Sequence, residues 1–192
     1  MLKTDVAEGW KVTTIGKLLK EKYIQNIQDG NHGEIHPKSN DYVDEGIPFI
    51  MANTLSDGKI DFNKSKKLPK VITDKLRIGF SLPGDILLSH KGTVGEVAVV
   101  PDKLDYPYLM LTPQVTYYRT NQELLYNKFL YYVFNSLYFQ NQIEKLSSQS
   151  TRAYVGITSQ GSFKIAIPDN INEQRDIIDI LEKIENNKRL SD

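Results

Sequence analysis

The segment that constrains this fold most is residues 84–101, GDILLSHKGTVGEVAVVP. It holds two short apolar runs, Ile86–Ser89 and Val97–Val100, with Pro and Gly residues at its outer boundaries. Apolar runs of this length between turn-forming residues are typical of strands. The connection between the runs, His90–Glu96, includes two glycines, which tolerate the positive φ values of tight turns. The segment therefore predicts two antiparallel strands joined by a glycine-containing connection.

Other short apolar runs predict further strands. Trp10–Leu19 is expected to form a short strand that leads into a helical turn, and a turn at Ser56–Gly58 should precede a strand at Ile60–Phe62. Three more strands are expected at Ile47–Ala52, Val115–Arg119 and Phe163–Ile167. The polar, glycine-containing stretch Gln25–Glu45 is expected to be a long surface loop.

Two longer helices are expected in the second half of the chain. Gln122–Leu146 contains neither Gly nor Pro, and its apolar residues recur at four-residue spacing at Leu125, Phe129, Val133 and Leu137. Residues 170–192 predict a second helix, capped by Asn170 with Glu173 at the third position. Its apolar stripe consists of Ile177, Ile180, Leu181 and Ile184. We expect this stripe either to fold back on the body or to bind a partner.

Composition indicates a soluble globular protein. The length of 192 residues suits one domain with a C-terminal appendage, and 40% hydrophobic with 25% charged residues is ordinary for this class. The formal net charge is zero, so any binding of nucleic acid must depend on local patches. One basic cluster is present, at Lys64, Lys66, Lys67, Lys70, Lys75 and Arg77. A solvated basic face is the alternative interpretation of this cluster.

Cysteine is absent, which excludes disulfides, thiolate metal sites and a cysteine nucleophile. Residues 1–10 have no apolar signal segment, and no apolar run approaches the ~18 residues that a membrane span needs. We therefore expect a cytoplasmic protein that does not associate with membranes.

Motifs for catalysis and cofactor binding are also missing. The sequence contains no G-x-x-x-x-G-K-[ST], no G-x-G-x-x-G and no G-x-S-x-G motif, and no nuclease or amino-methyltransferase motif. His32 and His36 have the spacing of two metal ligands on a helix, but glycine and proline surround them. We expect no catalytic residue, no metal site and no cofactor in this chain.

Several motifs, taken in order, resemble one family. They are Ala7–Trp10, Gly46–Ile50, Gly84–Pro101 and Leu111–Gln114. This order is similar to that in the target recognition domain of the specificity subunit of Type I restriction-modification systems. The closing Ile165–Pro168 with Glu173 and Gln174 resembles the junction where that domain passes into the subunit's conserved spacer helix. The resemblance covers nearly the whole chain.

The resemblance implies a mixed α/β fold. Residues 1–169 would form a recognition domain with a bent, largely antiparallel β-sheet and packed helices, and residues 170–192 would begin the spacer or dimerisation helix. Such a domain recognises one half of a split double-stranded DNA sequence, and the subunit docks modification (methyltransferase) subunits. A full subunit carries two such domains, so this chain would pair with a second copy or a second recognition domain through its C-terminal helix. S-adenosylmethionine and ATP are then expected on the partner subunits only.

Polar segments supply the candidate DNA-binding residues. In the major groove arginine suits guanine and Gln or Asn suits adenine, while lysines hold phosphates. The candidates for base contacts are His90, Lys91, Gly92 and Thr93 on the connection, Gln149, Ser150, Thr151, Arg152 and Tyr154 on a polar break, and Asn53. Lys64, Lys66 and Lys67 are expected to supply the sequence-independent part of binding.

Two other functions compete with this interpretation. A recognition domain from another kind of modification system would bind DNA equally well but would lack an exposed partner helix. A protein interaction scaffold would bind partners without any salt-sensitive affinity for DNA. The apolar stripe at Ile177, Leu181 and Ile184 favours the separate specificity subunit.

Overall fold

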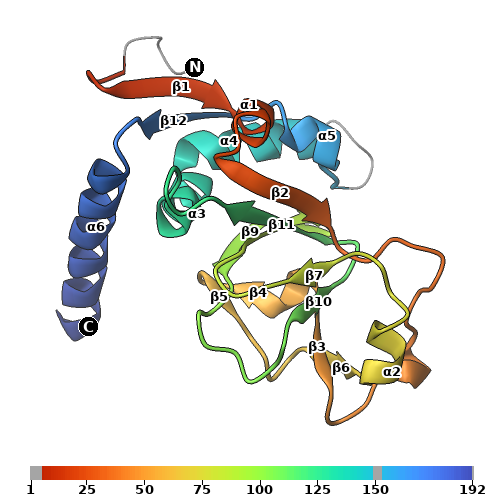
Figure 1. The fold of residues 1–192 in the computed structure, drawn as a ribbon. Coiled ribbons are helices and arrows are strands. Elements are labelled where there is room, and N and C mark those ends of the chain that lie inside the picture. The colour runs from red at the N-terminus through yellow and green to blue at the C-terminus, as the bar shows by residue number, and fades with distance from the viewer. Residues whose placement is uncertain (1–5, 149–152, 192) are drawn as a thin grey trace.

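The computed structural model describes residues 6–148 and 153–191. Its strands are β1 (Trp10–Thr14), β2 (Ile24–Asp29), β3 (Ile47–Ile50), β4 (Leu55–Ser56), β5 (Lys59–Ile60), β6 (Lys66–Leu68), β7 (Phe80–Ser81), β8 (Ile86–Lys91), β9 (Thr93–Val99), β10 (Leu109–Leu111), β11 (Val115–Thr120) and β12 (Lys164–Pro168). Its helices are α1 (Ile15–Lys20), α2 (Lys70–Thr73), α3 (Asn127–Asn135), α4 (Leu137–Ser147), α5 (Ile157–Gln160) and α6 (Ile171–Ser191), with 3-10 turns η1 (Ser39–Asp41) and η2 (Ala52–Thr54). Figure 1 shows their arrangement, and the predicted mixed α/β, largely antiparallel fold is confirmed.

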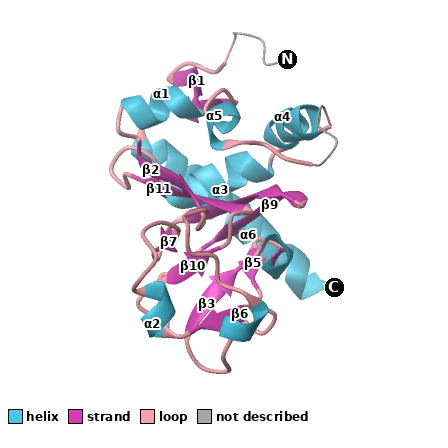
Figure 2. Ribbon diagram, turned by 90° about the vertical axis from the view of Figure 1, so that its right-hand side faces the viewer, coloured by secondary structure: helices cyan, strands magenta, loops and turns pink. Residues whose placement is uncertain are grey.

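The central sheet has the strand order β2-β11-β8-β9, and every pairing in it is antiparallel. Side chains on a strand alternate between the two faces of a sheet. On β8, Ile86 and Leu88 join the main core with residues of α1, α3 and α4, whereas Leu87 joins a second core with residues of β3 and β10. Both faces of the sheet are therefore covered, one mainly by helices and the other by a second sheet (Figure 2).

The second sheet has the order β6-β3-β10-β7 and contains the one parallel pairing among the described strands, between β3 and β10. Its small core holds Phe49, Leu68 and Met110. Beside it, β4 and β5 form a hairpin around the predicted turn, with left-handed φ values of 51° at Asp57 and 74° at Gly58. A Cβ on Gly58 would lie 2.0 Å from the Tyr131 hydroxyl, so only glycine fits this turn.

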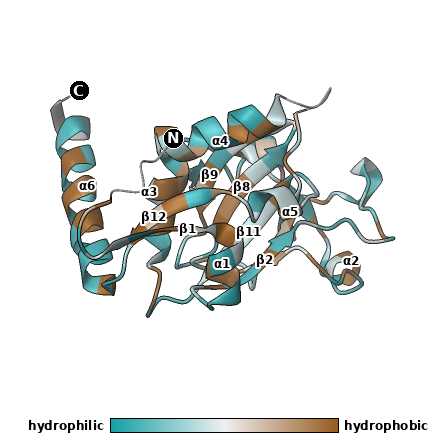
Figure 3. Cartoon of the chain, turned by 90° about the horizontal axis from the view of Figure 1, so that it is seen from above, coloured by the Kyte–Doolittle hydropathy of each residue, from teal (hydrophilic) through white to brown (hydrophobic). Residues whose placement is uncertain are grey.

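The first strand and the last strand lie side by side at one edge of the molecule (Figure 1). β1 pairs with β12 in antiparallel register, with Trp10 opposite Pro168. This pairing places the start of β1 beside the start of α6. From there α6 turns away from the two strands (Figure 1), and hydrophobic and hydrophilic residues alternate along it (Figure 3).

The helix expected over Gln122–Leu146 is instead two helices, α3 and α4. Ser136 separates them with extended backbone (φ −67°, ψ 145°), and its hydroxyl accepts a hydrogen bond from the Phe139 amide as the N-cap of α4. The break lets the rings of Phe134 and Phe139 stack with centroids 4.1 Å apart in the core. Leu137, predicted on the buried stripe, is 82% exposed as a result.

Two other expectations were partly wrong. The polar stretch Gln25–Glu45 contains most of β2, which pairs with β11 because Ile24 and Ile27 pack into the main core. The predicted connection His90–Glu96 lies mostly within β8 and β9, and the turn itself is only Gly92. The remaining predicted strands correspond to β1, β3, β5, β11 and β12, with shifts of a few residues at their ends, whereas β4, β6, β7 and β10 were not predicted.

Candidate nucleic-acid interface

The tip of the β8–β9 hairpin lies against the chain segment that follows the polar break. Lys91 forms an isolated antiparallel bridge with Tyr154. The amide of Val155 donates to the carbonyl of His90 at 2.9 Å. Residues 153–155 therefore pair with the end of β8, past the point where its pairing with β11 stops. The hairpin tip and the segment after the polar break, which were predicted as separate sites, lie together. The candidates Gln149, Ser150, Thr151 and Arg152 lie outside the described residues.

The hairpin tip, Lys91–Thr93, is exposed to solvent. Gly92 has a φ of 82°, in the left-handed region that favours glycine, and its amide donates to the carbonyl of Ala153 at 3.3 Å. Tyr154 keeps 47% of its surface exposed beside the tip. A cation, a hydroxyl and an aromatic ring are thus displayed together on a short, well-defined turn.

His90 lies beneath the hairpin tip rather than on its surface. It is only 2% exposed, and its ring centroid is 5.7 Å from that of Tyr154. Nε2 is 3.5 Å from Oδ1 of Asp29, yet neither ring nitrogen makes a hydrogen bond within the described residues. Burial lowers the pKa of His90, while the negative charge of Asp29 opposes that shift. His90 is therefore mostly neutral at physiological pH and supports the tip from below.

A cavity of about 350 Å³ adjoins the tip. It is lined by Asn31, His36, Pro37, Tyr42, Phe49, Met51, Lys91, Thr112, Pro113 and Gln114. A Cβ on Gly92 would lie 3.7 Å from Nε2 of Gln114, so this carboxamide is directly beside the tip. Its Oε1 accepts from the amide of Ala52 at 3.4 Å. Sequence analysis missed Gln114 as a candidate, although its position just before the strand β11 next to Pro113 is the kind of loop position that carries recognition residues.

Asn53 and the three predicted lysines are not among the residues that line this cavity. Asn53 is exposed on η2, which contacts β8 and β9. Lys66 is exposed on β6 and lies opposite Phe49, a residue of the cavity wall. Lys64 pairs with Asp61 at 3.1 Å, and the Nζ of Lys67 lies 6.0 Å from the centre of the Tyr106 ring. The charge of the basic cluster is therefore partly neutralised by Asp61. Lys66 is the member of the cluster that lies opposite a residue of the cavity wall in the sheet.

The apolar stripe expected on the C-terminal helix is divided between two surfaces. Ile178, which sequence analysis did not single out, is completely buried, and Ile177 and Leu181 pack partly against the main core. Burying one such side chain stabilises the folded state by about 2 kcal/mol. Ile180 and Ile184 remain 57% and 46% exposed. Within the described residues no helix has the length and apolar character needed to cross a membrane.

The α6 junction, where α6 meets the body, is held by polar contacts. Gln174 is completely buried. Its Oε1 accepts from the amide of Tyr126 at 2.9 Å, and its Nε2 donates to the carbonyls of Leu124 at 3.1 Å and Pro168 at 3.2 Å. The expected cap is present, because Oδ1 of Asn170 accepts from the amide of Asn172 at 2.9 Å.

Two further pairs hold the α6 junction. Glu173, expected to complete the capping box, accepts instead from the indole N–H of Trp10 at 2.7 Å. Nζ of Lys128 pairs with Glu182 at 2.7 Å, and this hydrogen bond raises the pKa of Lys128. Side chains from β1 and α3 therefore fix the direction in which α6 leaves the body.

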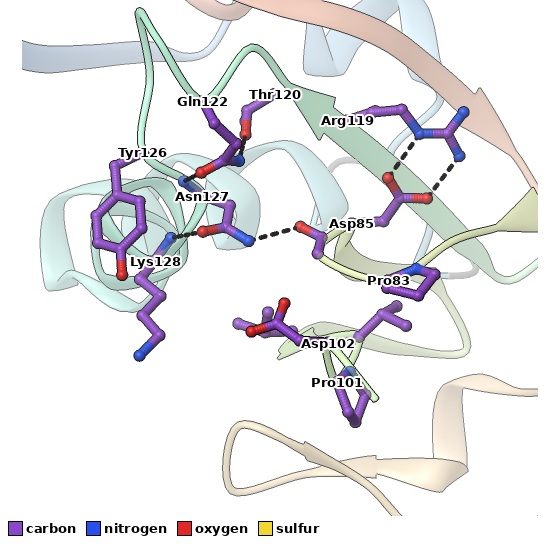
Figure 4. A pocket seen from close by; sticks show the side chains of 13 residues that line it. Pro83, Asp85, Pro101, Asp102, Arg119, Thr120, Gln122, Tyr126, Asn127 and Lys128 are labelled. Atoms are coloured by element: carbon purple, nitrogen blue, oxygen red, sulfur yellow. Dashed lines mark hydrogen bonds and ion pairs between the residues drawn. The ribbon is translucent and has the colours of Figure 1, made fainter. Parts of the chain in front are cut away.

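Another cavity, of about 450 Å³, lies elsewhere and is drawn in Figure 4. Its central charges are paired with each other, because Nε and Nη2 of Arg119 donate to the two carboxylate oxygens of Asp85, each at 2.8 Å. Nδ2 of Asn127 donates to the Gly84 carbonyl at 2.9 Å. In the part of the chain that the structure describes, no group of three His, Asp or Glu side chains could hold a metal ion. The contacts in this cavity brace the end of the central sheet against α3.

A family model described as the Type I restriction modification DNA specificity domain matches residues 8–191. The chain belongs to this family. Among curated relatives in it, the Type I restriction enzyme MjaVIII specificity subunit of Methanocaldococcus jannaschii is 24% identical over 186 residues, which cover 95% of this chain and 41% of the relative. The Type I restriction enzyme EcoBI specificity subunit of Escherichia coli is 20% identical over 179 residues, which cover 93% of this chain and 35% of the relative.

Solved structures share the fold. The HsdS subunit from Thermoanaerobacter tengcongensis superposes with a TM-score of 0.66 at 19% identity, covering 97% of this chain and 40% of that one. The S subunit of the Type-I restriction-modification system from M. genitalium gives a TM-score of 0.60 at 19% identity, covering 97% and 41%. The chain spans about 40% of the length of the specificity subunits that it matches.

Proposed function

We propose that this chain recognises one half of a bipartite double-stranded DNA sequence, as the specificity subunit or half-subunit of a Type I restriction-modification system. One observation carries the proposal beyond family membership. The hairpin tip and the segment around Tyr154 meet beside a cavity that presents Gln114 and Lys91. In this proposal residues 1–169 are the recognition domain and residues 170–192 begin the spacer helix.

The chemistry of the candidate residues suits this task. A β-hairpin can enter the major groove, which is about 12 Å wide. There Arg152 would pair with guanine and Gln149 or Gln114 with adenine, while Lys91 and Thr93 at the tip would contact bases or phosphates. Lys66, on the neighbouring sheet, would contribute sequence-independent phosphate contacts.

The proposed partners bind through other parts of the chain. Modification subunits would supply S-adenosylmethionine, ATP would bind another subunit, and this chain would be the non-catalytic component, acting in the cytoplasm. The exposed face of α6, with Ile180 and Ile184, is apolar enough to pack against the helix of a second recognition domain or of a second copy. An assembly paired through α6 would then contain two recognition domains, one for each half of the DNA sequence.

A binding selection tests the proposal. The full chain would be incubated with randomised duplex DNA, with and without a cognate modification subunit, at two salt concentrations. We expect enrichment of one short, asymmetric motif, with affinity that falls as salt rises because lysine contacts release counterions. Failure to enrich any motif in either condition contradicts the proposal and favours the interaction scaffold.

A further inference from the structure

A second buried glutamine lies behind the hairpin tip. Gln160, the last residue of α5, is completely buried. Its Oε1 accepts from the hydroxyl of Tyr118, and its Nε2 donates to Oγ1 of Thr116 at 3.2 Å and to the carbonyl of Val155 at 2.9 Å. One side chain therefore joins α5, the central strand β11 and the segment that pairs with the hairpin tip.

The polar contacts continue from Gln160 toward His90. Oγ1 of Thr116 donates to Oδ1 of Asp29 at 2.5 Å, and that oxygen is 3.5 Å from Nε2 of His90. The ring of His90 in turn lies under Tyr154. A row of polar side chains thus crosses three strands of the central sheet and ends beneath the exposed residues of the candidate site.

Buried polar side chains are a costly way to fill a core, because each requires hydrogen-bond partners. An apolar residue at position 160 would fill the same space between α5 and β11. What it could not do is hold the carbonyl of Val155, whose own amide donates to His90. Since Val155 is bonded on both sides, its position relative to β8 is fixed.

We propose that Gln160 is a positioning residue for DNA discrimination, an inference that rests on the proposed function. By holding Val155, it keeps residues 153–155 paired with β8, so that Tyr154 and the hairpin tip present one surface. Gln160 itself contacts no DNA, since it is fully buried.

The proposal predicts a specific separation of effects. Loosening Val155 should weaken base-specific contacts, which depend on exact side-chain placement. It should leave phosphate contacts made from the other sheet by Lys66 largely intact. Discrimination would fall while the affinity for unrelated sequences and its salt dependence stay the same.

The test compares Gln160→Met with Gln174→Met in the full chain, with modification subunits present if the wild type requires them. Methionine has a similar length but lacks the amide. Gln174 is an equally buried glutamine with three hydrogen bonds, but it holds α6 instead of the hairpin tip. Fluorescence anisotropy would measure binding to the enriched duplex and to a scrambled duplex, at a temperature at which circular dichroism shows every variant folded. Hydrogen exchange would report on the Val155 amide.

We expect the ratio of the two affinities to fall about tenfold in Gln160→Met, the size of one lost base contact. The Val155 amide should exchange faster, and Gln174→Met should keep the wild-type ratio. An unchanged ratio in Gln160→Met, or an equal loss in Gln174→Met, overturns the positioning role. A wild type without any preference would instead refute the proposed function, and the positioning role with it.

A second variant guards against misfolding of Gln160→Met. Thr116→Val removes the hydroxyl that accepts from Gln160 at nearly constant volume, and it also removes the donor to Asp29. We expect it to lower the affinity ratio severalfold, with Thr116→Ser restoring it because serine keeps the hydroxyl. A wild-type ratio in Thr116→Val contradicts the proposal independently.

Discussion

Gln160 and Gln174 are both completely buried, and each forms three hydrogen bonds, but they hold different parts of the molecule. Gln174 bonds only to backbone groups, and the surrounding polar groups at the α6 junction, such as Trp10 and Glu173, are paired as well. The contacts of Gln160 continue through Thr116 and Asp29 to His90. The ring nitrogens of His90 make no hydrogen bond within the described residues.

This difference suggests different tasks. A fully paired junction is suited to holding a helix in one direction, since any displacement would leave buried backbone groups unsatisfied. The row of polar side chains from Gln160 ends in an imidazole whose ring nitrogens have no hydrogen-bond partner in the described residues, so its last member is held only by packing and by the charge of Asp29. The geometry of the hairpin tip and of residues 153–155 should therefore change more easily on single substitution than that of the α6 junction.

The largest expected effect is at the α6 junction. Gln174→Met leaves the amide of Tyr126 and the carbonyls of Leu124 and Pro168 without their partner. We expect the free energy of unfolding to fall by about 3 kcal/mol, because each buried unpaired group costs about 1–3 kcal/mol and water can reach some of them. Urea denaturation would measure it.

Gln142→Met is the matched control for that experiment. Gln142 also bonds to backbone, at Lys164, but at an exposed site where water replaces the lost partner. The free energy of unfolding of Gln142→Met should fall by less than about 1 kcal/mol. Equal losses in the two variants would show that burial at the α6 junction does not set the energy.

The next effect concerns the proposed discrimination between DNA sequences. Arg152→Ala should cost about 1–3 kcal/mol of binding free energy for the preferred base at one position and relax the preference there. Lys66→Ala should weaken binding to all sequences alike and reduce the salt slope by about 1. Competition binding against single-base variants of the enriched duplex would measure both. If Arg152→Ala weakens every sequence equally, it contacts phosphate instead of a base.

The dependence of stability on pH should distinguish the two regions. The pKa of His90 is lowered from its ordinary 6.5 mainly by burial, so below pH 6.5 the unfolded chain binds the proton more readily than the folded one. The contribution of His90 is therefore complete above pH 6.5 and decreases as the pH falls toward its folded-state pKa. Asp29, Lys91 and Tyr154 face this ring, and of the two charges the negative one of Asp29 counters the shift whereas the positive one of Lys91 adds to it.

At the α6 junction the dependence of stability on pH has the opposite sign. The hydrogen bond that Lys128 donates to Glu182 raises the pKa of Lys128 above 10.5, so its contribution to stability is complete below that pH and is lost as the pH rises through the higher folded-state value. Denaturation across pH 5 to 8 would compare the wild type with His90→Gln. This variant should reduce the dependence of the free energy of unfolding on pH on the acid side only. An unchanged acid slope in His90→Gln would mean that another group titrates there.

The smallest effect is expected at Gly156. A Cβ there would lie 3.0 Å from the hydroxyl of Tyr154, closer than ordinary contacts, so Gly156→Ala should push the tyrosine ring away from its present position. Because the tyrosine is half exposed, the cost in stability should stay below about 1 kcal/mol. The intrinsic fluorescence of the segment is difficult to isolate, so the nuclear magnetic resonance shifts of the Tyr154 ring, in wild type and variant, are the appropriate measurement. Unchanged shifts would contradict the close contact.

The sequence by itself determined the local elements whose signals are complete over a few residues. The apolar run at Ile86–Ser89 indicated a strand and Ser56–Gly58 indicated a tight turn, and both are present. The order of the family motifs was also sufficient to indicate the fold. These features depend on neighbours along the chain and on backbone preferences, so they can be recognised without the structure.

Only the tertiary structure decided where the hydrogen bonds and apolar faces of distant residues meet. Ser136 ends α3 because the core favours stacking of Phe134 on Phe139, which helical periodicity does not encode. Gln160 and Gln174 look like ordinary surface residues in the sequence, yet their partners lie 42 to 50 positions away for Tyr118, Thr116, Tyr126 and Leu124. A side chain is buried or exposed according to what the rest of the fold places against it, and that depends on long-range packing that no short pattern records.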